Sequence, residues 1–309
     1  MMNLENSIAI IIVTYNGAEW IDKCIYPLYD INNIKIIVID NNSADSTVKD
    51  IENKYPKVEL IISDVNLGFG QANNKGFEYA INNNFDFVFL LNQDASIDSQ
   101  NIEKLVFQYK KDKTVGILSP VHYKNETEIE NLFDFYLKDS NVDKSKVGND
   151  STENVKFVNA ALWLISVDNL KLIGGFNPLY FHYGEDVDYV NRLIYKKLNI
   201  SIVLNVKGFH YRNYSKEVFK KKFEKSRYFG PWNIKYYTIL SNINNSFTKT
   251  FVSSFNLFIR SFIKYFIKGY FKSSIMSLKI YFEILKKLTY IKKNREIQKN
   301  KPLPFINTN

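Results

Sequence analysis

Short apolar runs recur four times in the first hundred residues, and segments with helical spacing separate them. Strands that alternate with helices form right-handed βαβ units, because a parallel neighbour can be reached only by a crossover connection. This pattern predicts an α/β domain with a mostly parallel sheet covered on both faces. The strands are expected over residues 8–13, 34–39, 58–62 and 85–91, and the helices over residues 20–29, 46–55 and 71–82.

The fourth run, Phe85–Leu91, ends abruptly in Asn92-Gln93-Asp94. Such an apolar run is typical of a central strand, and open α/β sheets bind ligands beyond the carboxyl ends of their strands. Asp94 and the side-chain oxygen of Asn92 could approach one hard cation together with diphosphate oxygens, because Mg²⁺ and Mn²⁺ favour oxygen ligands. An Asx turn followed by a helix cap is the alternative interpretation.

The pattern continues less regularly beyond residue 100. Helices are expected over residues 102–110 and 186–197, and strands over 115–119 and 200–206. Residues 155–167 are apolar, and a short helix that ends at Gly174-Gly175 is expected after them. Residues 123–153 are polar and show no clear period. We predict one domain over residues 1–215 and a basic, aromatic helical extension over residues 216–309.

Two further strand ends carry polar side chains. Thr14-Tyr15-Asn16 follows the first strand, and Asp40-Asn41-Asn42-Ser43 follows the second. The carboxylate of Asp40 could accept the N3 imide hydrogen of uracil or thymine, a hydrogen that cytosine lacks. An Asx turn again remains the alternative.

Asn66–Gly76 lies between the third strand and its helix. Gly68-Phe69-Gly70 resembles the start of a dinucleotide loop, but the next glycine is six residues on and no acidic residue ends the following strand at the required distance. A nicotinamide enzyme is therefore not expected. The small residues at 68, 70, 72 and 76 are instead expected to let the backbone approach a ligand closely.

Glu185 and Asp186 are adjacent at the expected start of a helix. The helix dipole favours negative charge there and should lower the pKa of both carboxyl groups. Such a base is weak, but it can still take a proton from a sugar hydroxyl late in a displacement. A simple capping role is the alternative.

The chain has three histidines. His210 follows the last expected strand, which makes it a candidate metal ligand, although a packed histidine is an ordinary finding. His182 is close to Glu185 and could line an acceptor pocket, whereas His122 has a weaker claim.

Hydrophobic residues make up 45% of the chain, which excludes wholesale disorder. The single cysteine, Cys24, excludes an internal disulfide framework and fits a reducing compartment. The first residues show no basic region before an apolar run, so no secretion signal is expected.

The net charge of +9 divides unevenly along the chain. Residues 207–309 contain 22 Lys and Arg against 4 Asp and Glu, whereas residues 1–206 contain 19 against 28. Within residues 251–288, cations at 260, 264, 268 and 272 are spaced for one helix face among aromatic residues. No charge-free stretch is long enough to cross a bilayer, so this segment is expected to lie on an anionic membrane surface. Ordinary core helices are the main alternative, and nucleic acid is the weaker one.

Together these segments resemble glycosyltransferase family 2, in particular its bacterial rhamnosyltransferase-like branch. The matching motifs are Val13–Asn16, Val38–Ser43, Asn66–Gly70, Leu90–Asp94 and Gly174–Arg192, in that order. Two departures stand out: the metal motif begins with Asn92 instead of aspartate, and the frequent Arg-Asn pair of the family is Trp232-Asn233 here.

The resemblance implies a GT-A fold, a nucleotide-diphosphate sugar donor, and Mg²⁺ or Mn²⁺. It implies an inverting, metal-dependent transferase, best matched to dTDP-rhamnose, that works on a glycolipid or polysaccharide acceptor at the cytoplasmic face of the cell membrane. Asp186 and Glu185 would be catalytic, and Asp94 and His210 would hold the metal. The expected donor contacts are Thr14, Tyr15, Asn16, Asp40, Asn42, Gly68, Gly70, Asn74, Asn92, Gln93, Asp94 and Arg192, and the expected acceptor contacts are Trp163, His182 and Asp188.

Three alternatives stay open from the sequence. The donor could be a UDP-linked hexose, N-acetylhexosamine or galactofuranose. The chain could bind a sugar nucleotide or glycan without turning it over, which the retention of Asp94, Asp186 and Arg192 disfavours. A nucleotidyltransferase would need a glycine-rich basic loop after the first strand, where Thr14-Tyr15-Asn16-Gly17 stands instead.

Overall fold

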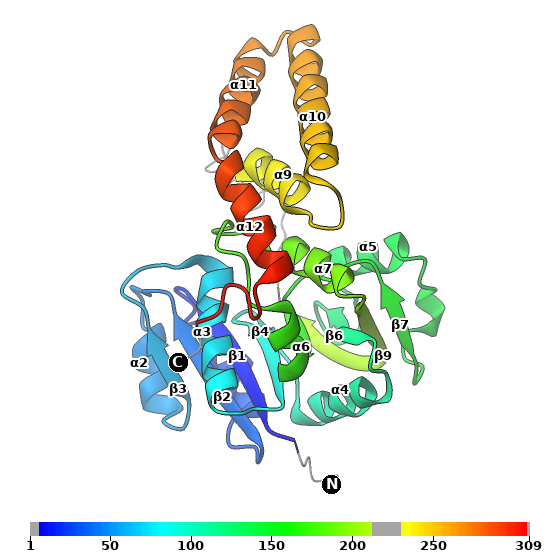
Figure 1. Ribbon diagram of the computed structural model, residues 1–309. Helices are drawn as coiled ribbons and strands as arrows, with labels where there is room; N and C mark the ends of the chain where they lie inside the picture. The colour runs from blue at the N-terminus through cyan, green and yellow to red at the C-terminus, as the bar shows by residue number, and fades with distance from the viewer. Residues whose placement is uncertain (1–5, 212–229, 308–309) are drawn as a thin grey trace.

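The computed structural model describes residues 6–211 and 230–307, and it consists of an α/β body with a helical projection (Figure 1). Within these residues the central sheet has the strand order β3-β2-β1-β4-β8-β6-β9-β5, and β7 pairs with β9 outside this path. The strands are β1 (Ile8–Thr14), β2 (Ile34–Asp40), β3 (Glu59–Ile62), β4 (Phe87–Asn92), β5 (Ala95–Ser96), β6 (Val115–Tyr123), β7 (Thr152–Val155), β8 (Leu162–Ser166) and β9 (Asn199–His210).

The first four strands form the parallel half of the sheet, as the sequence predicts. β1 pairs in parallel with both β2 and β4, and β2 pairs in parallel with β3. The other half is mixed, because β8 lies antiparallel between β4 and β6, while β6 and β9 are parallel. The prediction of an α/β fold with a mostly parallel sheet is confirmed.

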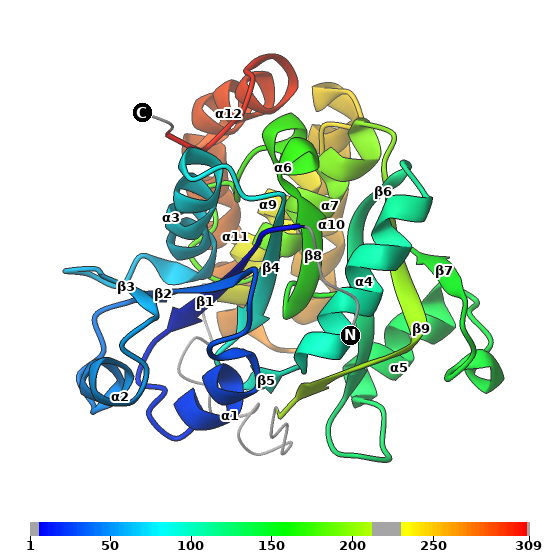
Figure 2. The ribbon, with the colours of Figure 1, turned by 90° about the horizontal axis from the view of Figure 1, so that it is seen from below.

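Helices cover both faces of the sheet (Figure 2). The alternation of β1 explains this arrangement, since Ile8, Ile10 and Ile12 pack into one core and Ala9 and Ile11 into the other. The helices of the body are α1 (Ile21–Ile25), α2 (Thr47–Lys54), α3 (Gly68–Asn82), α4 (Ser99–Lys111), α5 (Asn131–Asp139), α6 (Val167–Ile173) and α7 (Glu185–Tyr195), with 3-10 turns at Tyr26–Leu28 and Lys144–Lys146.

Local differences from the sequence prediction have simple causes. The helix expected over residues 20–29 ends at Ile25 and continues as a 3-10 turn that contains Pro27, a residue without a backbone N–H. α3 begins at Gly68 and not at Gln71. The polar stretch 123–153, which shows no clear period, contains α5 and the start of β7.

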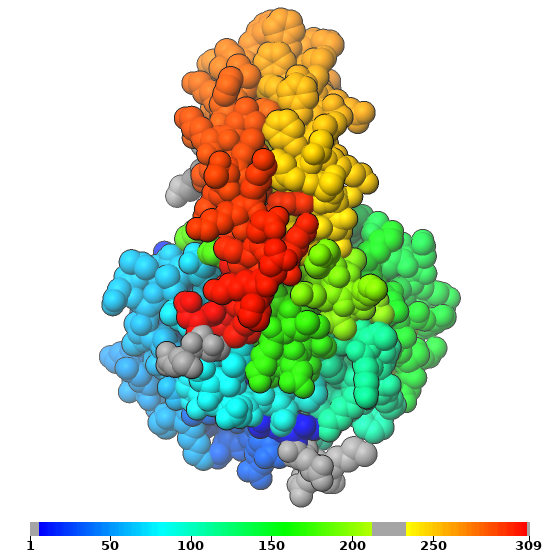
Figure 3. Space-filling model, viewed as in Figure 1, coloured from blue at the N-terminus to red at the C-terminus, as the bar shows by residue number. Residues whose placement is uncertain are grey.

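Within residues 230–307 the helices are α9 (Gly230–Ser241), α10 (Phe247–Ile267), α11 (Phe271–Lys286) and α12 (Leu288–Asn300). α10 and α11 form an antiparallel hairpin that projects away from the body (Figures 1 and 3). The expected single helix face of cations is therefore wrong: the turn at Gly269, with φ of 74°, separates Arg260 and Lys264 on α10 from Lys272 on α11. Among the helices of residues 6–211 and 230–307, none combines the length and the apolar content that crossing a bilayer requires.

The last described residues return to the body. The carbonyl of Pro304 accepts the amide of Gly175 at 2.8 Å, and the carbonyl of Phe305 accepts Nδ2 of Asn74 at 3.2 Å. Ile306 is buried in the same hydrophobic core as α3 and α6. The predicted boundary at residues 215 and 216 lies outside the described residues, but the end of the C-terminal part is integral to the α/β core.

Candidate functional site

The carboxyl end of β2 is organised by Asp40, which is fully buried. Its Oδ1 accepts the hydroxyls of Thr14, at 2.7 Å, and Ser43, at 2.6 Å, and its Oδ2 accepts the Ser43 amide at 2.8 Å. The Asx turn that the sequence left as an alternative is therefore present. Recognition of a base by Asp40 stays a prediction, and it would use the remaining acceptor capacity of Oδ2.

Hydrogen bonds join the loops that follow β1, β2 and β4. Gln93 accepts the Tyr15 amide through Oε1 at 2.9 Å and donates through Nε2 to the Tyr15 carbonyl at 3.3 Å. The Asn16 amide donates to Ser43 Oγ at 2.9 Å, and Asn16 Oδ1 accepts the Ala44 amide at 2.8 Å. The predicted donor contacts of these loops are thus adjacent, and the Tyr15 ring remains exposed at their edge.

Gly68 and Gly70 of α3 lie against other segments of the chain. A Cβ at Gly68, where φ is 77°, would collide with the carbonyl oxygen of Phe181, and one at Gly70 would lie 2.9 Å from Cβ of Phe176. The expectation that Gly68 and Gly70 let the backbone approach a ligand is corrected: the segment before α7 occupies that space. The same Gly70 position is 3.6 Å from Cβ of Glu185, so the N-termini of α3 and α7 meet.

Glu185 and Asp186 open α7 directly after Gly184, which has a left-handed φ of 91°. Glu185 is buried, and its Oε2 has no hydrogen-bond partner among the described residues. Burial, reinforced by the neighbouring charge of Asp186, raises the pKa of Glu185 to about 8. The expectation that the helix dipole would lower this pKa is wrong for Glu185, because the loss of solvation outweighs the dipole.

Asp186 lies closer to solvent than Glu185. It is half-buried, and its Oδ1 accepts the amide of Val187 at 2.8 Å. Of the two carboxyl groups it is the one that an incoming hydroxyl can reach with less displacement of protein atoms.

A second group of side chains lies where β4 and β9 end. β5 pairs with β9 so that Ala95 is opposite His210, which brings Asp94 next to that histidine. His210 Nε2 is 3.5 Å from Asp94 Oδ1, and His210 Nδ1 is 3.2 Å from Glu130 Oε2. His122 completes the group, with Nδ1 3.8 Å from the same Glu130 oxygen.

This group fits a divalent cation. One ligand atom each from His122, Glu130 and His210 lies within 4.8 Å of the others, and Oε1 of buried Glu130 has no hydrogen-bond partner among the described residues. Asp94 is partly exposed, so the Asp94–His210 end is the one open to a diphosphate. A mixed imidazole and carboxylate set suits Mn²⁺ better than Mg²⁺, which prefers oxygen alone.

Glu130 is the residue that the sequence reasoning missed. It precedes α5 in the polar stretch without a clear period, and its amide donates to the His122 carbonyl at 2.9 Å. The two histidines lower its pKa to about 2, although burial alone would raise it. His122 and His210 lie near the ends of β6 and β9, which are neighbours in the sheet. This pairing would have pointed to Glu130, but the sequence alone does not show it.

Four predicted contacts do not line the site. Arg192 is buried and donates to Asp188 Oδ2, at 3.0 Å, and to the carbonyls of Ile173 and Gly175, each at 2.7 Å. The roles predicted for Arg192 in donor binding and for Asp188 in acceptor binding are therefore corrected: both side chains hold α6 and α7 together.

The roles predicted for Trp163 and Asn74 are also corrected, because both side chains are buried. Trp163 is fully buried in the core between Phe176 and Tyr189, so it cannot contact an acceptor. Asn74 accepts the Phe176 amide at 2.7 Å and donates to the carbonyls of Phe176 and Phe305. The remaining predicted acceptor contact, His182, is exposed beside Tyr183.

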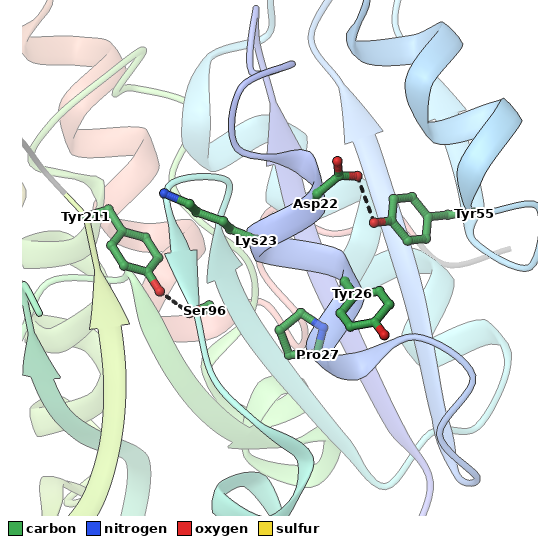
Figure 4. Close-up of a pocket in the computed structure, with 7 residues that line it drawn as sticks. All are labelled: Asp22, Lys23, Tyr26, Pro27, Tyr55, Ser96 and Tyr211. Atoms are coloured by element: carbon green, nitrogen blue, oxygen red, sulfur yellow. Dashed lines mark hydrogen bonds between the residues drawn. The ribbon is translucent and has the colours of Figure 1, made fainter. Parts of the chain in front are cut away.

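A cavity of about 630 Å³ adjoins the Asp94–His210 end. It is lined by Asp22, Lys23, Tyr26, Pro27, Tyr55, Ser96 and Tyr211 (Figure 4). The Tyr211 amide donates to the Asp94 carbonyl at 2.8 Å, but no predicted site residue lines the cavity. We therefore build the site from the loops at the sheet edge and not from this cavity.

The family model and the curated relatives that match this chain are all glycosyltransferases. The model of the family Glycosyl transferase family 2 matches residues 9–172. Glycosyltransferase SunS of Bacillus phage SPbeta and the SPbeta prophage-derived glycosyltransferase SunS of Bacillus subtilis (strain 168) are each 32% identical to the chain over 94 residues. The match covers 30% of this chain and only 21% of each relative, so the chain spans about a fifth of their length.

Solved structures share the fold. S. aureus TarS 1-349 in complex with UDP matches with a TM-score of 0.51 and 16% identity, over 79% of this chain and 68% of that one. GalNAc-T7 with UDP, GalNAc and Mn²⁺ matches with a TM-score of 0.55 and 14% identity, over 78% of this chain and 51% of that one. The GT-A fold implied by the sequence resemblance is confirmed, whereas the rhamnosyltransferase-like branch stays a prediction.

Proposed function

Because the chain belongs to glycosyl transferase family 2, we propose that it is an inverting, metal-dependent glycosyltransferase that uses a nucleotide-diphosphate sugar. The observation that carries the proposal is the placement of two carboxyl groups, those of Asp94 and Asp186. Asp94 lies beside His210 where β4 ends, and Asp186 opens α7 against the start of α3. The Asp94–His210 group fits a diphosphate with its cation, and the carboxylate of Asp186 can accept a proton.

Donor binding would use the linked loops after β1, β2 and β4. Asp40 accepts the N3 hydrogen of a uracil or thymine, and the exposed ring of Tyr15 packs on the base. Asn16, Asn42 and Gln93 lie in the same loops, and Asn92 is the last residue of β4. Asp94 and His210 would hold the cation, which supplies electrostatic stabilisation for the charge on the departing diphosphate.

Transfer follows from the position of Asp186. Its carboxylate takes the proton of an acceptor hydroxyl, and the freed oxygen attacks the anomeric carbon from the face opposite the nucleotide. The bond between that carbon and the diphosphate oxygen breaks, its electron pair leaves with the diphosphate, and the configuration inverts. Glu185 is protonated near neutral pH, so it can donate a hydrogen bond beside Asp186 and is not a second base.

For the donor we propose dTDP-rhamnose, supported by the sequence resemblance. The second candidate is a UDP-sugar, which the UDP named in the TarS and GalNAc-T7 structures favours. A ligand that binds only the folded state raises the melting temperature, so a thermal-shift series of dTDP-rhamnose and UDP-sugars with Mn²⁺ separates the two. For the acceptor we propose a lipid-linked or polysaccharide hydroxyl, reached from the cytoplasmic face of the membrane.

The test of the reaction is release of the nucleoside diphosphate in the presence of donor, Mn²⁺ and an acceptor extract. Asp186→Asn should lower turnover by about 10²–10⁴-fold, the usual contribution of a general base. Asp168→Asn, an exposed aspartate of α6, is the matched control and should not change it. Near-normal turnover of folded Asp186→Asn would refute the assigned role, and donor binding without any product would favour a noncatalytic binding protein.

A further inference from the structure

The α10–α11 hairpin has an unusual distribution of side chains. Toward its outer end the two helices face each other through small hydroxyl residues, because Ser261, Ser274 and Ser277 are buried between them. Ser274 Oγ donates across the interface to the carbonyl of Phe262 at 3.1 Å, and Ser277 Oγ donates to the carbonyl of Ser274 at 2.7 Å. Small residues that let two helices approach closely are typical of helix pairs in an apolar surrounding.

Large apolar side chains point outward from the same hairpin. Of the exposed large hydrophobic residues in the described part of the chain, ten lie between residues 247 and 286. Exposed apolar patches of this kind mark an interaction surface, since water disfavours them. They are Val252, Phe255, Ile263, Phe266, Ile267, Tyr270, Phe271, Ile275, Leu278 and Phe282.

Exposed apolar side chains are concentrated at the tip of the hairpin, which comprises residues 266–271. Around the turn at Gly269, Phe266, Ile267, Tyr270 and Phe271 are all more than half exposed, and Ile267 reaches 78%. The turn is the part of the hairpin farthest from the body (Figures 1 and 3). Nothing in the described residues covers these four side chains.

The charge around the tip has one sign. Residues 247–286 contain seven Lys and Arg against the single acidic residue Glu283. Lys264, Lys268 and Lys272 are exposed next to the apolar tip. Basic residues that flank exposed aromatic and aliphatic residues complement anionic headgroups above an acyl layer.

We propose that the tip of the α10–α11 hairpin inserts into the headgroup and upper acyl region of an anionic bilayer. Phe266, Ile267, Tyr270 and Phe271 enter the apolar layer, while the adjacent lysines bind lipid phosphates. The insertion is interfacial, in keeping with helices that are not apolar enough to cross. The proposal rests on the membrane location proposed above and adds the segment and the mode of binding.

The base of the hairpin connects to the candidate site. Tyr180, in the segment before α7, is hydrogen-bonded through its hydroxyl to Ser241 Oγ at the end of α9, at 2.6 Å. Gly184, next to Glu185, lies against Ile234 of α9. Insertion of the tip would therefore hold the site of Asp186 on the membrane side of the molecule, which suits an acceptor carried on a lipid.

The experiment is co-sedimentation of the full chain with vesicles of phosphatidylcholine alone or mixed with phosphatidylglycerol. The wild type should bind the mixed vesicles and bind neutral ones at least about tenfold more weakly, since anionic headgroups attract the exposed lysines of the tip. Ile267→Ser/Phe271→Ser should lower the partition coefficient by more than about tenfold, because two inserted side chains are lost. Phe135→Ser, an equally exposed residue of α5 in the body, is the matched control and should bind normally.

A second variant separates charge from apolar insertion. Lys268→Glu/Lys272→Glu should abolish the preference for anionic vesicles, whereas Lys111→Glu on α4 should not. Unchanged binding of both tip variants would overturn the proposal. A wild-type dimer that the tip variants convert to a monomer in solution would overturn it too, because a second copy would then cover the tip.

Sugar transfer to a water-soluble acceptor, measured on the same proteins, keeps the two proposals apart. The tip variants should retain it, since the turn between α10 and α11 lies far from α7 (Figure 1). Normal vesicle binding without transfer in any protein would defeat the proposed function and leave the hairpin inference standing.

Discussion

Nδ1 of His210 lies 3.2 Å from Oε2 of Glu130, on the side of the ring opposite the nitrogen that faces Asp94. A carboxylate at Nδ1 keeps the proton on that nitrogen and leaves Nε2 with a lone pair for a metal. In the proposed metal site, Glu130 would therefore position His210. The same Glu130 oxygen lies 3.8 Å from Nδ1 of His122.

Glu130→Ala should weaken Mn²⁺ binding by about 10–100-fold, the usual effect of removing such a partner from a metal-bound histidine. Calorimetric titration of Mn²⁺ into the protein measures this without any turnover. Glu128→Gln, an exposed glutamate of the same loop, should leave the affinity unchanged. If folded Glu130→Ala binds Mn²⁺ as the wild type does, Glu130 does not position His210.

Glu185 should make stability depend on pH. Its pKa is raised from 4.5 to about 8 in the folded protein, so the folded state keeps a proton that the unfolded chain releases between these values. The free energy of unfolding therefore falls as pH rises through this window and levels off above it. Glu185→Gln removes this dependence. The melting temperature of the variant minus that of the wild type should therefore rise by at least about 2 °C between pH 5 and pH 8.

Differential scanning calorimetry at several pH values checks this. The control is Glu19→Gln, an exposed glutamate, whose difference from the wild type should not change with pH. A constant offset for Glu185→Gln over the same range would mean that the buried carboxyl is not protonated.

Arg192→Lys should destabilise the protein without weakening donor binding by the folded fraction. A lysine cannot reach Asp188 and the carbonyls of Ile173 and Gly175 together, so buried groups lose their partners. Breaking a buried pair in this way costs about 3–5 kcal/mol. Urea unfolding and nucleotide titration measure the two quantities, and a stable variant with weakened donor affinity would restore the donor role expected from the sequence.

Ile306→Ala should lower the free energy of unfolding by about 2–4 kcal/mol, because it empties a buried position between the C-terminal segment and α3 and α6. Ile275→Ala on the exposed hairpin should stay within about 0.5 kcal/mol of the wild type. Equal effects of the two substitutions in denaturant unfolding would show that the end of the chain does not contribute to the core.

Much of the fold follows from local patterns in the sequence. The four apolar runs became β1 to β4 because each is a short apolar segment bounded by polar and turn-forming residues. The antiparallel insertion of β8 was not predictable, since periodicity does not say which strands pair. The hairpin turn at Gly269 was missed because lysines four residues apart continue across it in sequence.

The sequence by itself determined the alternating α/β body, the polar strand ends at Asp40 and Asp94, the acidic helix start at Glu185-Asp186, and the basic C-terminal third. Each of these is encoded within a few neighbouring residues. Only the tertiary structure decided that Glu130 joins His210, that Arg192 holds α6 and α7 together, and that the last residues return to the core. The physical reason is that burial and pairing depend on which distant segments share a solvent-free space, and this raises the pKa of Glu185 where a local dipole alone would lower it.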